Sequence, residues 1–377
     1  MKIDEFGVEI WMNAYEDHCA LNLAETCVES LTIAELLEIC GKTDSFMAEI
    51  LPMKMTYGAI EGSDRLRDAI CAMYLRQSRE NVVVTHGTIG ANALVHETLV
   101  EPGDRVISVL PTYQQHYSIP KSYGADVHIL PLHMQNGFLP DLAELERLAT
   151  PGTKLITINN PNNPTGSLMD AAFLEQVAAI ARRSGAYVLC DEVYRGTDQQ
   201  GSGFTTSIAD IYEKGISTAG MSKAFSLAGL RLGWIAGPTE LIRAVSIHRD
   251  YNTISVGMIN DYLAAIALEN RDKIIARSQR ITRENLAILD AWVAAEPLIT
   301  YLKPASGTTA LLRYHIDMPS RDFCIRLLQE TGVMLTPGSA MDMEGWLRIG
   351  YANNPAILRE GLGLMSGFLA KLGAEKR

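Results

Sequence analysis

Positive charge, paired cysteines and long apolar runs are all scarce in this sequence, and each shortage excludes a class of protein. The 377 residues carry 33 Lys and Arg against 44 Asp and Glu, a formal net charge of −11. Basic pairs such as Arg182-Arg183 are scattered rather than gathered into a stripe. Binding along nucleic acid or at an anionic membrane surface is therefore not expected.

Six cysteines are present, and none forms a C-x-x-C pair. This usage favours reduced thiols over a disulfide framework, and no metal site is expected. The apolar residues of 81–96 are broken up by polar ones, and residues 1–5 lack the apolar core of a signal peptide. We therefore expect a cytoplasmic protein.

Hydrophobic residues make up 47% of the chain and charged residues 20%, which is ordinary globular composition. A chain of this length fits one large and one small domain. We expect residues 1–45 to form an N-terminal arm and part of the small domain. Residues 46–280 are expected to form the large domain, and 281–377 the small C-terminal domain.

From about residue 80, short β-branched runs alternate with longer amphipathic segments. This alternation is typical of an α/β fold in which helices cover a mostly parallel central sheet. Strands are predicted at Val82–Thr85, Arg105–Leu110, Asp126–Leu130, Lys154–Asn159, Tyr187–Cys190, Ile216–Thr218 and Leu232–Ala236.

Several helices have sequence signals at their ends. The segment Asp170–Ser184 carries its apolar residues on one face and is followed by Gly185. A second helix begins with the capping-box pattern Thr32-Ile33-Ala34-Glu35, and the last one opens at Asn354-Pro355. We expect these last two to belong to the smaller domain, and one long helix over residues 258–294 to connect the domains.

Ligands of an open parallel sheet bind beyond the carboxyl ends of its strands, so the loops after the predicted strands form the candidate site. The small residues of His86-Gly87-Thr88-Ile89-Gly90 suit an anion held on backbone N–H groups, although a plain βα turn fits equally well. Tyr113, after the next strand, offers an aromatic face, for which simple packing is the alternative. The proline-rich run 160–166 is either a surface turn or a loop rigid enough to fix an Asn amide.

Charged residues follow two later strands. Asp191 ends a buried strand, where an unpaired carboxylate is costly, so it needs a cationic or proton-donating partner. Lys223 lies in the loop after the following strand, with Arg231 eight residues beyond it. Pyridoxal 5′-phosphate requires this combination: an amine for a Schiff base, an anion at the ring nitrogen, donors to the phenolate oxygen, a stacking face and an anion cradle.

Three motifs, in order along the chain, resemble the signatures of a known family. They are Asn163-Pro164-Thr165-Gly166, Asp191-Glu192-Val193-Tyr194, and Ser222-Lys223-Ala224-Phe225 continuing to Arg231-Leu232-Gly233. From about Leu21 onward the chain resembles the fold-type I pyridoxal-phosphate enzymes of the class I/II aminotransferase branch. The resemblance implies a mostly parallel sheet covered by helices, with a smaller α+β domain formed by both chain ends.

The resemblance also implies roles around the cofactor ring. Lys223 would hold pyridoxal phosphate as an internal aldimine and then shuttle the proton of the substrate α-carbon. Asp191 would pair with the ring nitrogen, supported by His116 behind it. Asn163 and Tyr194 would donate hydrogen bonds to the phenolate oxygen of the cofactor. Tyr113 would stack on its ring. The catalytic residues would be Lys223, Asp191 and Tyr194.

The phosphate would lie at the glycine-rich turn. Its contacts would be Gly87, Thr88, Ile89, Ser222 and, as the charged partner, Arg231. Tyr57 resembles the family residue that reaches the phosphate of the neighbouring subunit, which implies a homodimer with shared active sites. One departure from the family is Gly220, where many members have a hydroxyl residue; Thr218 or another residue would have to supply that hydrogen bond.

The substrate end of the site is marked by Arg348. It resembles the arginine that binds an α-carboxylate in a two-pronged pair, and so implies an amino acid or its 2-oxo acid as substrate. Asn163 and Ala24 would also contact the substrate. A second departure is Glu25, in a segment that is glycine-rich in common members. Glu25 is either a solvated loop charge, the favoured interpretation, or faces the substrate and favours a basic side chain.

The predicted function is an aminotransferase that moves an amino group between an amino acid and a 2-oxo acid in a ping-pong cycle. A pyridoxal-phosphate lyase, such as a β-eliminating C–S lyase, or an arginine-modifying enzyme is the alternative, because the cofactor residues are shared. A non-catalytic effector-binding domain is a remote third interpretation. Such a domain would not be expected to retain Lys223, Asp191, Arg231 and Arg348 together.

Overall fold

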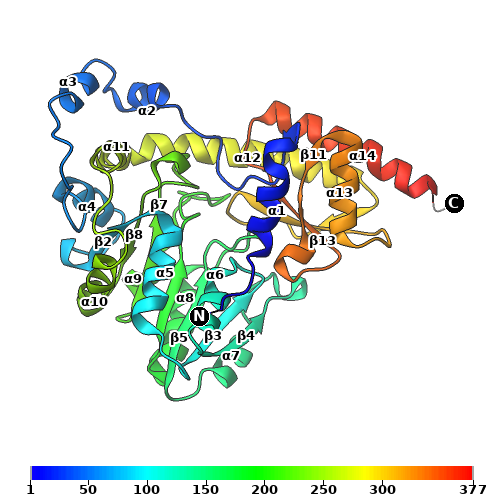
Figure 1. The fold of residues 1–377 in the computed structure, drawn as a ribbon. Coiled ribbons are helices and arrows are strands. Elements are labelled where there is room, and N and C mark those ends of the chain that lie inside the picture. Colours follow the sequence, from blue (N-terminus) through cyan, green and yellow to red (C-terminus); the bar gives the residue numbers. More distant parts are fainter. Residues whose placement is uncertain (1, 376–377) are drawn as a thin grey trace.

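A seven-stranded sheet forms the centre of the molecule (Figure 1). The computed structural model describes residues 2–375. The strands are β2 (Val82–Thr85), β3 (Arg105–Leu110), β4 (Asp126–Pro131), β5 (Thr153–Asn159), β6 (Tyr187–Asp191), β7 (Gly215–Gly220) and β8 (Gly233–Ala236). Their order is β2-β8-β7-β6-β5-β3-β4, and β8 runs antiparallel to both neighbours while the other pairs are parallel. The predicted mostly parallel sheet and each of its strands are confirmed.

Helices cover both faces of this sheet. They are α4 (Asp64–Cys71), α5 (Gly87–Leu99), α6 (Gln115–Ser122), α7 (Leu142–Leu148), α8 (Ala171–Ser184), α9 (Ile208–Ile211) and α10 (Thr239–Asp250). The neighbours Val188 and Leu189 of β6 point to opposite faces: Val188 packs with α7 and α8, and Leu189 with α5 and α10. Because both faces are covered, the inner strands β5, β6 and β7 are buried along nearly their whole length, whereas the edge strand β4 is mostly half-buried or exposed.

The predicted helix ends are confirmed by capping contacts. The side chain of Asp170 accepts a hydrogen bond from the first turn of α8, and Gly185 after its last turn has a φ of +78°. In α2 (Ile33–Cys40), Thr32 and Glu35 form both hydrogen bonds of the capping box.

The single long helix predicted over residues 258–294 is wrong. The structure has two helices there, α11 (Met258–Glu269) and α12 (Arg271–Ala295), separated at Asn270. The backbone of Asn270 leaves the helical region, with φ −110° and ψ 22°, and its side-chain amide donates to the carbonyl of Ile266 at 3.0 Å. The side chain therefore competes with the helix for a backbone acceptor and ends α11.

A second, smaller unit contains an antiparallel sheet of order β12-β13-β10-β9. Its elements are β9 (Ile299–Tyr301), β10 (Thr309–Tyr314), α13 (Ser320–Thr331), β11 (Val333–Met334), β12 (Thr336–Pro337), β13 (Trp346–Gly350) and α14 (Pro355–Glu375). Two N-terminal elements join it, α1 (Gly7–Tyr15) and β1 (Leu21–Asn22). β1 pairs in parallel with β11, and Trp11 of α1 is buried in the same core cluster as Phe323. Figure 1 shows the blue α1 beside the orange α13.

Helix α2 packs on the large part of the molecule. Its residues Leu36 and Leu37 share a core cluster with Leu66 of α4 and Leu263 of α11. α3 (Phe46–Ile50) follows at the same end of the molecule (Figure 1). The expectation that the helix after Thr32 belongs to the smaller domain is therefore wrong, because its apolar face covers α11. The domain boundaries at residues 45 and 280 stay predictions.

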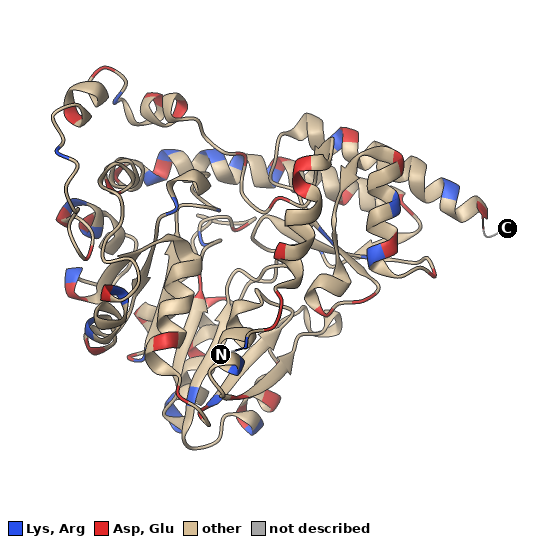
Figure 2. Cartoon of the chain, viewed as in Figure 1, with Lys and Arg blue, Asp and Glu red and all other residues tan. Residues whose placement is uncertain are grey.

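Charged residues of both signs are interleaved over the surface helices (Figure 2). Many are paired with each other, as Arg65 is with Glu269 and Arg182 with Glu213. Such exposed pairs keep the surface polar but add little to stability. Across residues 2–375, the helices are all too short or too polar to span a membrane.

Candidate active site

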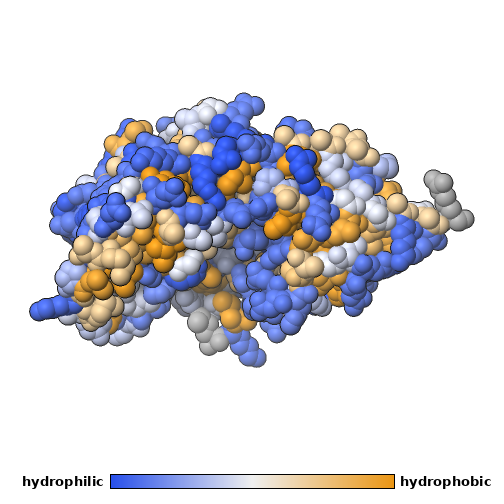
Figure 3. Space-filling view, turned by 90° about the horizontal axis from the view of Figure 1, so that it is seen from above, coloured by the Kyte–Doolittle hydropathy of each residue, from blue (hydrophilic) through white to orange (hydrophobic). Residues whose placement is uncertain are grey.

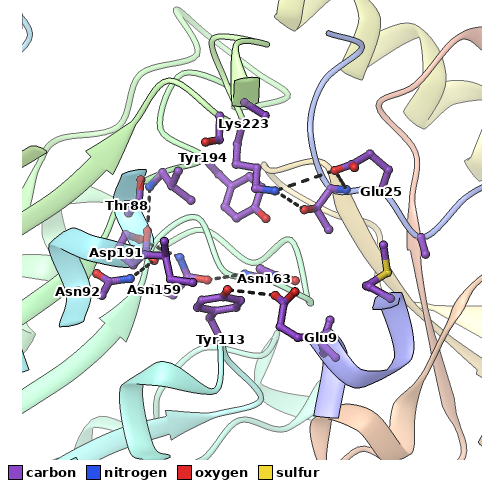
Figure 4. A pocket seen from close by; sticks show the side chains of 18 of the residues that line it. Glu9, Glu25, Thr88, Asn92, Tyr113, Asn159, Asn163, Asp191, Tyr194 and Lys223 are labelled. Carbon is purple, nitrogen blue, oxygen red and sulfur yellow. Dashed lines mark hydrogen bonds and ion pairs between the residues drawn. The ribbon is translucent and has the colours of Figure 1, made fainter. Parts of the chain in front are cut away.

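The predicted site residues gather around one cavity of about 430 Å³ (Figure 4). Its lining includes Ala24, Glu25, Thr88, Ile89, Tyr113, Asn163, Asp191, Tyr194, Ser222, Lys223, Arg231 and Arg348. Three regions of the chain meet here: the loops after the strands of the central sheet, the strand β13, and the N-terminal segment with α1 and the loop after β1. Gly87 and His116 lie directly behind this lining, next to Thr88 and Asp191.

Asp191 is held at the end of β6 by neutral donors. Its Oδ2 accepts from the Asn92 amide at 2.9 Å, and its Oδ1 from the backbone N–H of Val193 at 3.1 Å. His116 Nε2 lies 3.7 Å from the carboxylate, in the supporting position predicted for it. Asp191 is 4% exposed. These donors are the hydrogen-bond partners that the buried carboxylate requires.

Asn92, which the sequence analysis missed, is oriented by a second contact. The Thr218 hydroxyl donates to Asn92 Oδ1 at 2.6 Å, so the amide group turns its N–H toward Asp191. Thr218 is therefore engaged in the support of Asp191. Asn92 lies in the middle of α5, and a helix-interior Asn gives no sequence signal of such a role.

Lys223 extends into the cavity toward the segment after β1 (Figure 4). Its Nζ donates to Thr26 Oγ1 at 2.6 Å and lies 3.4 Å from Cys27 Sγ and 4.0 Å from Glu25 Oε1. Burial alone would lower the pKa of Lys223, but Cys27, Tyr194 and Glu25 raise it overall. Thr26 was not among the predicted residues, although it contacts the key amine.

Two buried tyrosines line the cavity between Lys223 and α1. Burial raises the pKa of Tyr194, against the opposing effect of Lys223. Burial also raises the pKa of Tyr113, and Glu9 raises it further because its Oε1 accepts the phenol hydrogen at 3.2 Å. Both phenols therefore keep their protons and can act as hydrogen-bond donors.

The glycine-rich turn after β2 presents unpaired donors to the cavity. The buried hydroxyl of Thr88 has no hydrogen-bond partner. Gly87 has a φ of +69°, and a Cβ there would lie 3.2 Å from Arg231 Nη2, so the arginine packs directly on the turn. Within residues 2–375, no carboxylate lies within 4.0 Å of the Arg231 guanidinium. Such an arrangement of hydroxyl, backbone and guanidinium fits a phosphate.

Gly220 leaves room for the Thr88 hydroxyl. A Cβ at Gly220 would lie 2.5 Å from Thr88 Oγ1 and 2.9 Å from the carbonyl oxygen of Leu232. The Thr88 hydroxyl therefore occupies space that a side chain at position 220 would need.

Replacing Gly220 with serine is expected to destabilise the protein by about 1–3 kcal/mol, because the new side chain overlaps neighbouring atoms. Thermal unfolding measures the change. The Thr88→Ala substitution in the same chain should recover part of the loss, since it removes one of the two overlaps. Gly367→Ser in α14, where a Cβ meets open space, is the matched control. Equal stability of G220S and G367S would contradict the close packing.

Arg348 is buried without a carboxylate partner. It is 4% exposed; its Nη2 donates to the Ala24 carbonyl at 3.2 Å and Thr336 Oγ1 at 3.1 Å, and its Nη1 to Asn163 Oδ1 at 3.5 Å. Its Nε has no partner in the described part of the chain. Burial lowers the pKa of Arg348 overall. A buried guanidinium with an unused donor is suited to bind an anion from the cavity.

Glu25 lines the cavity but its side chain stays partly exposed, so both interpretations of this residue, a solvated loop charge and a substrate contact, stay open. Its Oε1 accepts from the backbone N–H groups of Thr26 at 2.6 Å and Cys27 at 2.8 Å, which turn the side chain inward. Burial alone would raise the pKa of Glu25, but Lys223 and these N–H groups lower it overall. The side chain is still 40% exposed, so it lies toward the cavity mouth.

Tyr57 does not line this cavity. The residue is 78% exposed, and Met55 and Leu51 nearby are each 75% exposed. In the view from above, hydrophobic residues appear in patches among hydrophilic ones on the molecular surface (Figure 3). The role predicted for Tyr57, at the phosphate of a neighbouring subunit, therefore stays a prediction.

Helix α1 contributes cavity residues that the sequence analysis missed altogether. They are Val8, Glu9 and Met12, with Glu16 following in the next turn. These residues precede the motifs that carry the family resemblance, so no motif drew attention to them.

Comparison with known proteins identifies the family. A sequence model described as aminotransferase class I and II matches residues 42–362. The chain belongs to this family. It is accordingly a pyridoxal-phosphate-dependent enzyme with the fold of class I/II aminotransferases, as the resemblance implied.

Relatives with more than one activity are similar to this chain. A solved structure of a PLP-dependent aminotransferase from Streptococcus suis 89-1591 has a TM-score of 0.96 at 42% identity and covers 99% of both chains. Capreomycidine synthase from Streptomyces vinaceus is 31% identical over 306 residues, which is 81% of this chain and 78% of that protein. A PLP-dependent cyclase, OrfR, has a TM-score of 0.91 at 27% identity, covering 98% of both chains.

Proposed function

We propose that this protein is an aminotransferase that moves an amino group between an amino acid and a 2-oxo acid. The observation that carries the proposal is Arg348, a buried guanidinium with an unpaired donor in the same cavity as Lys223. An α-carboxylate satisfies that donor, and the attached α-carbon then lies in the cavity that the lysine amine also enters.

The other cavity residues are proposed to hold the cofactor. Pyridoxal phosphate, when bound, supplies a ring that accepts the electron pair left on the substrate α-carbon. Asp191 stabilises the positive charge on the ring nitrogen, and His116 and Asn92 position Asp191. The remaining contacts are assigned as follows: Tyr113 to the ring face, Asn163 and Tyr194 to the phenolate oxygen, and Gly87, Thr88, Ile89, Ser222 and Arg231 to the phosphate.

Lys223 is proposed to move the proton. Its Nζ would take the proton from the substrate α-carbon as a general base and then donate it to the bound cofactor as a general acid. Thr26 Oγ1, 2.6 Å from Nζ, steadies the amine on the substrate side of the cavity. We further propose that two subunits assemble and that Tyr57 of each completes the site of the other.

The direct test follows ¹⁵N from a labelled amino acid into an added 2-oxo acid, using the holoenzyme. An aminotransferase transfers the label to the acceptor and, without acceptor, releases at most one 2-oxo acid per subunit. Parallel lines in double-reciprocal plots at varied acceptor would support the ping-pong cycle. Continuous release of ammonia without acceptor would overturn the proposal in favour of a lyase.

A cyclase or lyase acting on a basic amino acid is the second candidate. Two observations favour it: the similar proteins include capreomycidine synthase and the cyclase OrfR, and Glu25 faces the cavity 4.0 Å from Lys223. In the ¹⁵N experiment this activity consumes the amino acid without labelling the acceptor. Mass analysis of the product then separates ring closure from elimination.

Substitution of Arg348 with glutamine is expected to lower kcat/KM for amino acids by about 10²-fold, because a buried charge partner of the α-carboxylate is lost. The wild-type enzyme should discriminate strongly between an amino acid and the amine that lacks its carboxylate, and R348Q should not. Arg313→Gln, on the exposed side of neighbouring β10, is the control. Unchanged discrimination in R348Q would remove Arg348 from the substrate site.

A further inference from the structure

The cavity holds more negative charge than the proposed reaction uses. Four carboxylates line it, from Glu9, Glu16, Glu25 and Asp191, together with three cations, Lys223, Arg231 and Arg348. Under the proposed function, on which this inference rests, Asp191 and the three cations each act on the cofactor or on the substrate α-carboxylate. The three glutamates are left without a role.

These glutamates come from consecutive N-terminal elements and lie on one side of the cavity. Glu9 is in α1, Glu16 is in the turn that follows it, and Glu25 is in the loop after β1. Figure 4 shows Glu9 beside Tyr113 and Glu25 near Lys223, both reaching in from the N-terminal segment. We call Glu9, Glu16 and Glu25 the glutamate wall.

Under the proposed function, the cations that act on the glutamate wall, Lys223 and Arg348, are engaged by the cofactor and by the substrate α-carboxylate. Glu9 accepts from the Tyr113 hydroxyl and Glu16 from the Asn22 amide, both neutral donors. In the described part of the chain, Glu9 and Glu16 have no Lys, Arg or His nitrogen within 4.0 Å, and Glu25 has Lys223 alone. Burial raises the pKa of Glu16, and neighbouring Glu25 raises it further. Three carboxylates close enough to repel one another are stabilised when a cation binds between them.

A second observation places a ligand in the same cavity. Arg348 is 96% buried, and its Nε has no partner, so the cavity also contains a fixed site for an anion. A ligand that satisfies both features carries a carboxylate at one end and a cation at the other. Because Lys223 lies beside Glu25, the reacting amino group of that ligand belongs between the two ends.

We infer that the amino acid substrate carries a cationic side chain, an ammonium or a guanidinium, which the glutamate wall binds while Arg348 binds the α-carboxylate. The glutamates then select the substrate by charge, and they leave the transfer chemistry to Lys223 and the cofactor. Neutral amino acids of the same length leave three carboxylates unpaired and are disfavoured.

The test compares amino acids that differ in charge but little in shape: arginine with citrulline, and lysine with norleucine. The holoenzyme is expected to favour the charged member of at least one pair by about tenfold to a hundredfold in kcat/KM. Arginine or lysine should also raise the melting temperature of the holoenzyme more than the neutral analogue does, a readout that does not depend on turnover. High salt should reduce the preference, because exposed parts of the wall are screened.

Glutamine variants test which glutamates cause the preference for a charged side chain. Glu25→Gln keeps an acceptor oxygen for the Thr26 and Cys27 N–H groups but removes the charge, and Glu9→Gln keeps an acceptor for Tyr113. Each should lower the ratio of kcat/KM for the charged amino acid to kcat/KM for its neutral analogue about tenfold. Glu5→Gln, an exposed residue one turn before Glu9, is the matched control and should change neither.

The outcomes separate the inference from the proposed function. If neutral and charged amino acids donate equally well, or if the glutamine variants lower both members of a pair alike, the inference is overturned and the aminotransferase proposal stands. If charged amino acids bind and stabilise the enzyme but no amino group reaches an acceptor, the proposed transfer fails while the charge selection stands.

Discussion

Lys223→Ala is expected to abolish amino-group transfer, with a loss well beyond the ~10²–10⁴-fold attributable to a general base alone. The lysine is proposed to act twice, as the amine that bonds the cofactor and as the carrier of the α-proton, and alanine removes both functions. Among residues 2–375, Lys223 supplies the only lysine amine in the cavity lining. Measurement of 2-oxo acid formed per subunit in a single turnover gives the size of the loss.

A second readout makes this prediction specific. Borohydride reduction should attach the cofactor to a peptide that contains residue 223 in the wild-type protein, and the attachment should be absent in K223A. Lys121→Ala is the control, since that side chain is 65% exposed on α6 and pairs with Asp4. A K223A enzyme that turned over at the wild-type rate would refute the proposed mechanism outright.

Asp191→Asn is expected to lower kcat by about 10³-fold with a smaller effect on KM. The carboxylate now accepts hydrogen bonds from Asn92 and Val193 at the end of β6. Asparagine matches its shape but carries no charge, and its own N–H₂ group faces donors that need an acceptor. Without this carboxylate, the positive charge on the ring nitrogen is no longer stabilised. The ring is then a weaker acceptor for the electron pair of the substrate α-carbon, so the reaction slows.

The conservative variants distinguish charge from shape. Asn92→Ala removes one donor to Asp191 but keeps its charge, so it should slow the reaction far less than D191N does. The visible absorbance of the bound cofactor should shift in D191N, because its position reports the charge of the ring nitrogen, and stay close to wild type in N92A. A D191N enzyme with normal kcat would show that Asp191 is only a structural residue at the end of β6.

The central sheet was predictable because its signals are local. Most strands are short, β-branched runs with buried residues on both faces, and Asp170 and Gly185 mark the ends of α8 by contacts within a few residues. The loops after these strands were also predictable as the site, since parallel strands end at one edge. The sequence therefore predicted where Asp191 and Lys223 lie, and it indicated the cofactor that they suit.

The rest of the site depends on contacts between distant segments. Asn92 reaches Asp191 across 99 positions, and Thr26 reaches Lys223 across 197, so neither has a signal in its own neighbourhood. The inward direction of Glu25 depends on two backbone N–H groups whose placement requires the folded loop. The break at Asn270 was missed for a different reason: helical periodicity continues on both sides of it, and one side-chain contact ends α11.

The parallel pairing of β1 with β11 joins segments far apart in the sequence, so it can form only late in synthesis. Leu21 lies beside Val333, and the cavity lining extends from Val8 to Arg348. A chain emerging from the ribosome can complete the central sheet, and with it the phosphate turn, more than a hundred residues before Arg348 is available. We therefore expect the proposed cofactor contacts of the central sheet to form during synthesis before the proposed substrate contact of Arg348.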